Sequence, residues 1–366
     1  ARGSSVRFFH WGGSDTINRW LDTVLAPALV ERHGVRLERV AMEASAFVEK
    51  LSAEKAAGKT TGSIDLVWIN GENFARAKAG GLLRGPFTQL LPAFAAGVNP
   101  ETAALDFGTP TEGHESPWGR AQFVFEADRA RVPVPPTDLG ALSAWIKANP
   151  GRFTWPELPD FTGSAFLRQT MVGLARAAGD KGPWTMDDYP ALSERLFAWL
   201  DEVRPYLWKE GKTWPRSPAE LDQLFARGEV DFNMNYSQSH AQNKIDEGLY
   251  PDTVYTFVLR EGALANTHFV AIPFNAPNMA AALVLANLLL EPELQASKAD
   301  PAQWGDFPVL DPALLGPEKS AVLEGLARGP AILDLETLAA SALPELSPEF
   351  VTALEKDWNA RVLEAP

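Results

Sequence analysis

Phe269–Ala296 is the segment that most restricts what this chain can fold into. It reads as a short apolar strand, a turn rich in Pro and Asn, and an apolar helix closed by Glu291–Pro292–Glu293. The apolar run Ala280–Leu290 is too short to span a bilayer and contains Asn287, so it predicts a helix buried in protein. A strand followed closely by a buried helix is typical of α/β sheets.

Strands and helices alternate along the rest of the chain, which predicts an α/β fold with sheets covered by helices. Ser217–Glu220 combines an N-cap Ser, a Pro at the first helical position and a Glu at the third, and so predicts a helix start. Short strands are expected at Phe153–Trp155 and Gln122–Glu126. With 366 residues, of which 46% are apolar, the chain exceeds one comfortable core and predicts two lobes.

Composition excludes several classes of function. The net charge of −14 disfavours nucleic acid and anionic lipid as partners through long-range repulsion. Absence of Cys excludes disulfides and thiolate chemistry and fits an oxidising compartment. The five His residues lack metal-site spacing such as HExxH, so we expect neither a metal nor a cofactor. No leader is evident at Ala1, as in a mature secreted chain.

Four polar turns stand at the ends of predicted strands or the starts of predicted helices: Trp11–Ser14, Asn70–Asn73, Asp160–Ser164 and Asn233–Ser237. In open α/β sheets, ligands bind beyond the carboxyl ends of strands, where turns expose backbone N–H groups. We therefore expect ligand contacts from residues of these turns, namely Trp11, Gly12, Gly13, Asn70, Glu72, Asp160, Thr162, Gly163, Asn235 and Tyr236. Four further candidates lie outside these turns, namely Trp118, Asn266, Trp208 and Asp306.

Each candidate also has a structural interpretation. Trp11 can pack a strand end, and Glu72 or Asp160 can cap a helix or turn. Asn235 and Asn266 can serve only to satisfy turn backbone, which is the commoner use of Asn.

The whole chain is similar to extracellular solute-binding protein family 1, whose type II group includes thiamine, polyamine and ferric-iron binders. The phrases that carry this resemblance are HWGGSDTINRWLD, IDLVWINGENF, SPWGRAQFVFEAD, WPELPDFTGSAFLRQ, GEVDFNMNYSQSHAQ and NTHFVAIPFNAPN. The resemblance implies the type II periplasmic binding protein fold, with two α/β lobes of mixed sheets joined by a two-crossover hinge. It also implies a monomer in the periplasm that captures a small molecule between its lobes and delivers it to an ABC transporter permease in the inner membrane.

The lobe boundaries follow from combining this resemblance with the pattern of elements. Lobe 1 is expected at 1–121 and 272–310, and lobe 2 at 122–271, with hinge strands near 122–126 and 266–271. Residues 311–366 are expected to form a C-terminal helical segment packed on the lobes.

The four turns contain Glu72 and Asp160 but no Lys or Arg, and they contain aromatic residues. A cationic nitrogenous solute, similar to thiamine or a polyamine, is therefore the preferred ligand, because it can stack on an aromatic ring beside a carboxylate. A neutral sugar or a small anion are alternatives with the same fold. Tyr236 has no adjacent Tyr, which argues against a ferric site.

A carbohydrate-active hydrolase is a further alternative, because Trp-rich clefts with paired carboxylates perform acid/base chemistry. The carboxylates of Glu72, Asp160, Asp231 and Glu261 form no recognisable local pair, so we expect a binding protein and no enzyme.

Overall fold

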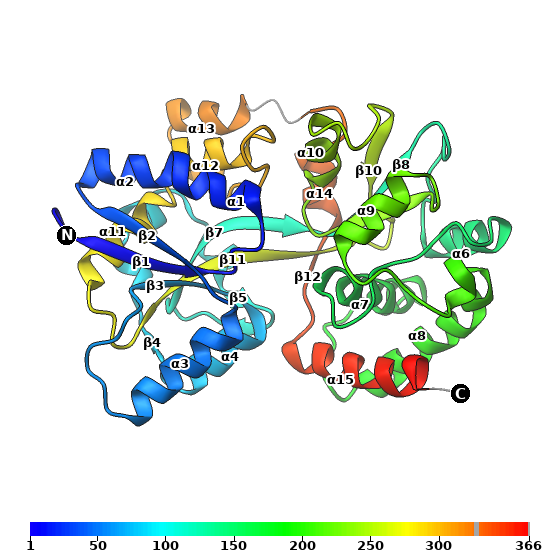
Figure 1. The fold of residues 1–366 in the computed structure, drawn as a ribbon, viewed down its shortest axis with the longest axis horizontal. Coiled ribbons are helices and arrows are strands. Elements are labelled where there is room, and N and C mark those ends of the chain that lie inside the picture. Colours follow the sequence, from blue (N-terminus) through cyan, green and yellow to red (C-terminus); the bar gives the residue numbers. More distant parts are fainter. Residues whose placement is uncertain (326–328, 365–366) are drawn as a thin grey trace. The chain divides into compact units, whose positions relative to one another are not determined.

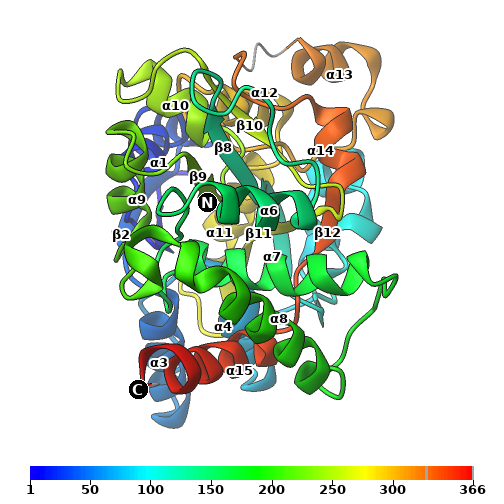
Figure 2. The same cartoon turned by 90° about the vertical axis from the view of Figure 1, so that its right-hand side faces the viewer.

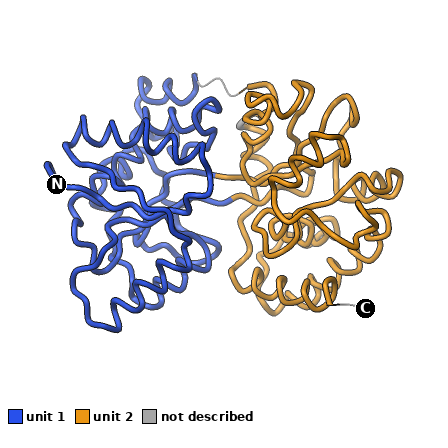
Figure 3. Tube along the Cα trace, in the orientation of Figure 1, with its two compact units in different colours: residues 1–120, 266–328 blue, residues 121–265, 329–366 orange. Residues whose placement is uncertain are grey.

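The computed structural model describes residues 1–325 and 329–364, and the chain divides into two compact units (Figure 3). Unit 1 comprises Ala1–Arg120 and Asn266–Arg328, and unit 2 comprises Ala121–Ala265 and Gly329–Pro366. The division places three chain passages between the units, where sequence analysis expected two. The first lies within strand β7 and the second within strand β11.

The sheet of unit 1 is mixed (Figure 1). Strand β1 (Ser5–His10) pairs in parallel with β2 (Arg36–Ala41) and β3 (Leu66–Ile69). Strand β11 (Ala263–Pro273) runs antiparallel to β3 and β4 (Leu83–Arg84), and it also pairs with β7 (Glu115–Gln122). A separate hairpin is formed by β5 (Leu105–Asp106) and β6 (Thr109–Pro110). Because β1 and β3 are parallel neighbours, the turns after them emerge at one edge of the sheet.

Helices cover this sheet, and apolar residues from both form its core. The helices are α1 (Asp15–Trp20), α2 (Ala26–His33), α3 (Ala44–Ala56), α4 (Gly71–Ala79), α5 (Pro92–Gly97), α11 (Met279–Leu288), α12 (Pro292–Ala299) and α13 (Pro317–Glu324), with a π-helical stretch Leu21–Leu25 and 3-10 turns at Thr88–Leu90, Pro100–Ala103 and Pro312–Leu314. The predicted apolar helix is α11, and its Leu285 and Leu288 are fully buried against Phe8 and Val6 of β1 within one cluster.

In residues 1–325 and 329–364, no single helix has the length and apolar content to cross a bilayer, whereas the pair α11 and α12, bent by 63°, meets both conditions together.

The main sheet of unit 2 has β8 (Val124–Asp128) between β10 (Val254–Phe257) and β9 (Phe232–Asn235), with both pairings antiparallel. Strand β12 (Ala342–Pro344) pairs in parallel with the Ala263–Ala265 end of β11. The helices are α6 (Leu139–Ala148), α7 (Phe161–Ala177), α8 (Tyr189–Val203), α9 (Pro218–Ala226), α10 (His240–Asp246), α14 (Leu335–Ser341) and α15 (Pro348–Trp358), with 3-10 turns at Arg204–Tyr206 and Trp208–Gly211 and a π-helical stretch Asn359–Leu363. Helices α6, α7 and α8 pack side by side (Figure 2).

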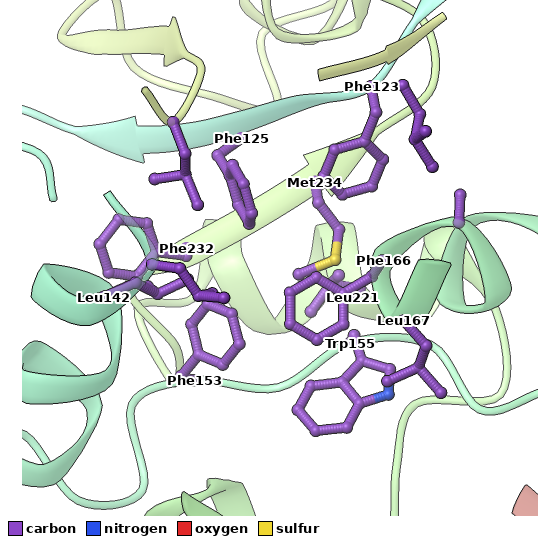
Figure 4. Close-up of a cluster of buried hydrophobic side chains, with 14 of the residues drawn as sticks. Phe123, Phe125, Leu142, Phe153, Trp155, Phe166, Leu167, Leu221, Phe232 and Met234 are labelled. Carbon is purple, nitrogen blue, oxygen red and sulfur yellow. The ribbon is translucent and has the colours of Figure 1, made fainter. Parts of the chain in front are cut away.

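Many aromatic side chains pack together in the core of unit 2 (Figure 4). The rings of Trp155 and Phe166 lie 4.8 Å apart, and Phe153 lies 5.7 Å from Phe166. Phe153–Trp155 was expected to be a strand, and this prediction is wrong, because the segment has no ladder partner and is irregular. Its alternating apolar residues fill the core between α7 and the sheet instead of pairing at a sheet edge.

Two further differences concern the passages between units. The expected crossover strand Gln122–Glu126 is divided in the structure, because β7 ends at Gln122 and β8 belongs to the sheet of unit 2. The expected C-terminal segment 311–366 is also divided, with 311–328 in unit 1 and 329–366 in unit 2. The apolar face of α15 explains the second assignment, since Phe350, Leu354 and Trp358 are buried in the core of unit 2.

Candidate functional site

The turn after β1 presents an exposed aromatic ring. Trp11 is 52% exposed, and its indole folds back over Gly13, where a Cβ atom would stand 2.3 Å from a ring carbon. Gly12 has a φ of +76°, and a Cβ there would stand 2.4 Å from the Cβ of Ala41. Gly12 therefore requires glycine, whereas a side chain at position 13 would displace the Trp11 ring. The turn ends at Ser14, whose Oγ caps α1 by accepting the Ile17 N–H at 3.3 Å.

His10, the last residue of β1, contacts this turn. It was not among the predicted site residues. Burial, reinforced by nearby Arg39, lowers its pKa to about 4, so the imidazole is neutral near pH 7. Its Nδ1 accepts the Gly12 N–H at 3.1 Å, which fixes the start of the turn.

The turn after β3 uses its polar groups internally. Asn70 donates from Nδ2 to the Thr267 carbonyl at 2.6 Å and accepts the Trp68 indole N–H at 2.9 Å, so its amide ties β3 to β11. The Gly71 N–H, at the start of α4, donates to Asp106 Oδ2 at 2.6 Å. Glu72 is exposed in the first turn of α4, where its carboxylate is free to meet solvent or a ligand.

The turn before α7 in unit 2 is capped by its own carboxylate. Asp160 Oδ1 accepts the N–H groups of Thr162 and Gly163 at 2.9 and 3.0 Å. Burial raises the pKa of Asp160, and the two backbone hydrogen bonds counteract that rise. A Cβ on Gly163 would stand 1.9 Å from the Pro156 carbonyl oxygen, so this position also requires glycine. Phe161, which lies between Asp160 and Thr162 in this turn, is 48% exposed.

The turn after β9 meets the turn before α7. The rings of Tyr236 and Phe161 lie 5.2 Å apart, so these two predicted turns are in contact within unit 2. Tyr236 itself is 6% exposed and donates its OH to Glu345 Oε1 at 2.6 Å. Asn235 accepts the Ser237 N–H at 2.9 Å, which is the local turn role that sequence analysis weighed for it.

The remaining candidates lie outside these turns. Trp118 is fully buried in unit 1, with its ring 4.9 Å from Trp68, and in this placement it packs the core. Asp306 forms ion pairs with Lys298 and, at 3.1 Å, with His268. The amide oxygen of Asn266 is buried without a hydrogen-bond partner in the described part of the chain.

Trp208 occupies a different region of unit 2. Its ring is partly buried against the core and carries the Lys209 ammonium 4.0 Å from its centroid. Its backbone N–H donates to the Phe153 carbonyl.

Sequence reasoning missed four residues that shape these turns: His10, Asp106, Phe161 and Glu345. Phe161 carried a usable signal, because it is an apolar residue inside an otherwise polar turn. The other three act through contacts distant in sequence, which local patterns do not reveal. In residues 1–325 and 329–364 no group of three or more His, Asp or Glu side chains is arranged to hold a metal ion.

Solved structures define the class to which this fold belongs. The spermidine/putrescine ABC transporter substrate-binding protein PotD from Streptococcus pneumoniae is similar, with a TM-score of 0.70 and 14% identity over 99% of both chains. The periplasmic binding protein AfuA from Actinobacillus pleuropneumoniae, solved with fructose-6-phosphate, gives a TM-score of 0.65 and 13% identity over 98% of this chain and 99% of AfuA. The fold is that of the type II periplasmic binding proteins.

Sequence comparison then gives the family. Residues 25–323 match the family described as bacterial extracellular solute-binding protein, and the chain belongs to this family. Protein YnjB of Escherichia coli strain K12 is 42% identical over 367 aligned residues, covering 99% of this chain and 92% of YnjB. Family and fold are those of transport binding proteins and not of enzymes. They imply a small-molecule ligand, an ABC transporter permease as partner, and a periplasmic or extracellular location.

Proposed function

We propose that this solute-binding protein captures a small cationic nitrogenous molecule, similar to thiamine or a polyamine, and delivers it to an inner-membrane permease. The proposed contacts come from both units: Trp11 and Glu72 in unit 1, and Asp160, Phe161 and Tyr236 in unit 2. Closure of the two units about β7 and β11 is part of the proposal, as is a monomeric, periplasmic protein.

The observation that carries the proposal is the occupation of helix N-termini by the chain's own Asp side chains. Helix N-termini bind anions through free N–H groups and the helix dipole. At α7 two of these donors already bind Asp160, and at α4 the Gly71 N–H binds Asp106. An anionic ligand would find these donors already occupied and would meet the carboxylates of Asp160 and of the exposed Glu72, whereas a cation would be attracted to both.

Exposed aromatic rings provide the second part of the recognition. Trp11 and Phe161 are about half exposed although each belongs to a turn with tight backbone constraints. A cation over such a ring gains about 0.5–2 kcal/mol, depending on how far it is desolvated. The Arg168 guanidinium already lies 5.6 Å from the Phe161 centroid, but it is neutralised by Glu345 and buried.

The structural relatives share the fold, but their names and titles mention ligands of different charge. PotD is named for spermidine and putrescine, whereas AfuA was solved with a sugar phosphate. A neutral sugar would also stack on Trp11 and Phe161, so the charge of the ligand is the property to test.

A thermal-shift screen tests the proposal, because a ligand that binds only the folded protein raises its stability by mass action. At least one of thiamine, putrescine and spermidine should raise the unfolding temperature, and fructose-6-phosphate and glucose should not. Asp160→Asn keeps a capping oxygen but removes the charge, so it should weaken cation binding by roughly tenfold, equivalent to about 1.4 kcal/mol. Trp11→Ala should weaken it by about 2- to 30-fold, following the cation–π range.

Leu90→Ala is a matched control for Trp11→Ala, because Leu90 is also an exposed apolar side chain of unit 1, at 56%. It should leave binding unchanged. Stabilisation by the sugar phosphate alone, or equal cation affinity in Asp160→Asn and the unmodified protein, would contradict the proposal.

A further inference from the structure

A buried polar network in unit 2 holds both ends of the turn that carries Asn235 and Tyr236. Asn233, before the turn, donates from Nδ2 toward Glu126 Oε2 and Asp222 Oδ1, both at 2.9 Å. His240, after the turn, contacts the same two carboxylates, with Nδ1 2.8 Å from Glu126 Oε1 and Nε2 3.4 Å from Asp222 Oδ2. Segment 234–239, which comprises the last two residues of β9 and the turn that follows, thus lies between two residues that contact one pair of carboxyl side chains. We call this segment the loop.

This network is charged and deeply buried. Glu126 and Asn233 are fully buried, and Asp222 is 6% exposed. Burial opposes a charge on His240, but attraction to Glu126 and Asp222 outweighs it and raises the pKa of His240 to about 10. Tyr250 completes the network by donating its OH to Asp222 at 3.0 Å. The imidazolium and two carboxylates together carry one net negative charge, and breaking such a buried group leaves an uncompensated charge.

Within the loop, separate contacts fix the residues that the network does not touch. Tyr236 is held by Glu345, and the side chain of Gln238 accepts the backbone N–H of Gln122 at 3.2 Å. The middle of the loop therefore depends on partners from β7 and from the C-terminal segment, whereas its two ends depend on β8 and α9.

We propose that Glu126, Asp222 and His240 are positioning residues, which hold segment 234–239 in the conformation that binds the solute. The part concerning the solute rests on the proposed function. Within residues 1–325 and 329–364, no hydrogen bond joins the network to the side chain of Asn235 or Tyr236, so its effect on binding acts through the backbone of the loop. A pre-ordered loop avoids the entropic cost of ordering on binding.

The experiment compares His240→Gln with the double variant His240→Gln/Asp222→Asn and with Leu142→Ala. The single variant leaves two buried carboxylates without a cation, and the double variant restores the original net charge. Leu142 is fully buried in α6, in the same core but outside the network. The substitution Leu142→Ala should therefore lower the stability of unit 2 without disturbing Glu126, Asp222 or His240.

Amide hydrogen exchange and the dissociation constants of thiamine, putrescine and spermidine are measured for each protein under conditions where all are folded. His240→Gln should accelerate exchange across 235–239 by at least about tenfold relative to Leu142→Ala. It should also weaken cation binding by about tenfold or more, and the double variant should recover part of both effects. The proposal would be overturned if residues 235–239 of His240→Gln exchanged at the same rate as in the Leu142→Ala control. It would also be overturned if their exchange were accelerated while the affinity for the cations stayed unchanged.

The two proposals fail in different ways. If the unmodified protein binds none of the three cations, the proposed function is wrong, while the exchange data still decide whether the network anchors the loop. If it binds one of them and His240→Gln binds it equally well, the positioning role is wrong and the proposed function stands.

Discussion

Two buried carboxyl groups of unit 1 differ from three of unit 2, because the two in unit 1 lack a cationic partner in the described part of the chain. In unit 2, Glu345 pairs with Arg168 through two bonds of 3.0 and 3.1 Å, and Glu126 and Asp222 share His240. In unit 1, both oxygens of Glu115 and one of Asp106 lack a hydrogen-bond partner in the described residues.

Buried carboxyl groups therefore have pKa values shifted in opposite directions, according to whether a cationic partner is present. Without a cationic partner, burial raises the pKa of Asp106 to about 8 and that of Glu115 well above its usual value. With His240 beside it, the pKa of Asp222 is lowered although burial alone would raise it. In unit 1, Asp306 pairs with Lys298 and His268, and its pKa is likewise lowered although burial opposes this, so the partner and not the unit decides the direction. The raised pKa keeps Asp106 largely protonated at acidic and neutral pH. The histidines follow the same rule, because His10 is neutral and His240 is charged.

Among these variants, removing the cationic partner of Glu345 should change the free energy of unfolding most. Arg168→Met leaves Glu345 buried without a cation, which should lower the free energy of unfolding by about 3–5 kcal/mol. Urea unfolding followed by Trp fluorescence measures this loss. The double variant Arg168→Met/Glu345→Gln removes both charges and should recover most of the stability. A single variant as stable as the unmodified protein would show that the pair is not charged or not buried.

Removing a buried carboxyl group from unit 1 should raise the free energy of unfolding, whereas Arg168→Met should lower it. The folded-state pKa of Asp106 is raised, so its contribution to stability is fully present below the unfolded-state value of about 4 and is lost as the pH rises toward 8. Asp106→Asn should therefore be neutral near pH 4 and stabilising by about 1–3 kcal/mol at pH 8. Urea unfolding at several pH values measures this difference. A gain independent of pH would contradict the assigned protonation.

The helix caps, which are similar in both units, should give the smallest effects. Ser14 caps α1 and Ser217 caps α9, each accepting an N–H three residues later at 3.3 Å. Ser14→Ala and Ser217→Ala should each cost about 0.5–2 kcal/mol, without a dependence on pH between 5 and 9. A loss well above this range in one unit would indicate that the turn, and not the cap alone, depends on that serine. Thermal and urea unfolding of the two variants provide the comparison.

Local signals predicted the elements whose causes are local. The cap at Ser217 and the helix Leu139–Ala148 are present as expected, because capping and apolar periodicity act within a few residues. The strand expected at Phe153–Trp155 is absent, since a short apolar run does not reveal whether a ladder partner exists.

The candidate turns followed from strand ends, but their supporting contacts did not. Arg168 and Glu345 are 177 residues apart in sequence, and Asn70 binds Thr267 from 197 residues away. Asp106 lies in a stretch without periodicity, so nothing near it marked it as the residue that binds the start of α4. Partner choice over such distances depends on the assembled fold, which one sequence does not contain.

Isothermal titration calorimetry of the unmodified protein tests the central claim most directly. Thiamine, putrescine, spermidine, glucose and fructose-6-phosphate are titrated in turn at low and at high salt concentration. We predict that at least one of the three cations binds tightly, with an affinity that falls as salt screens Glu72 and Asp160. Tight binding confined to the sugar phosphate, or to the neutral sugar, would contradict recognition of a cation.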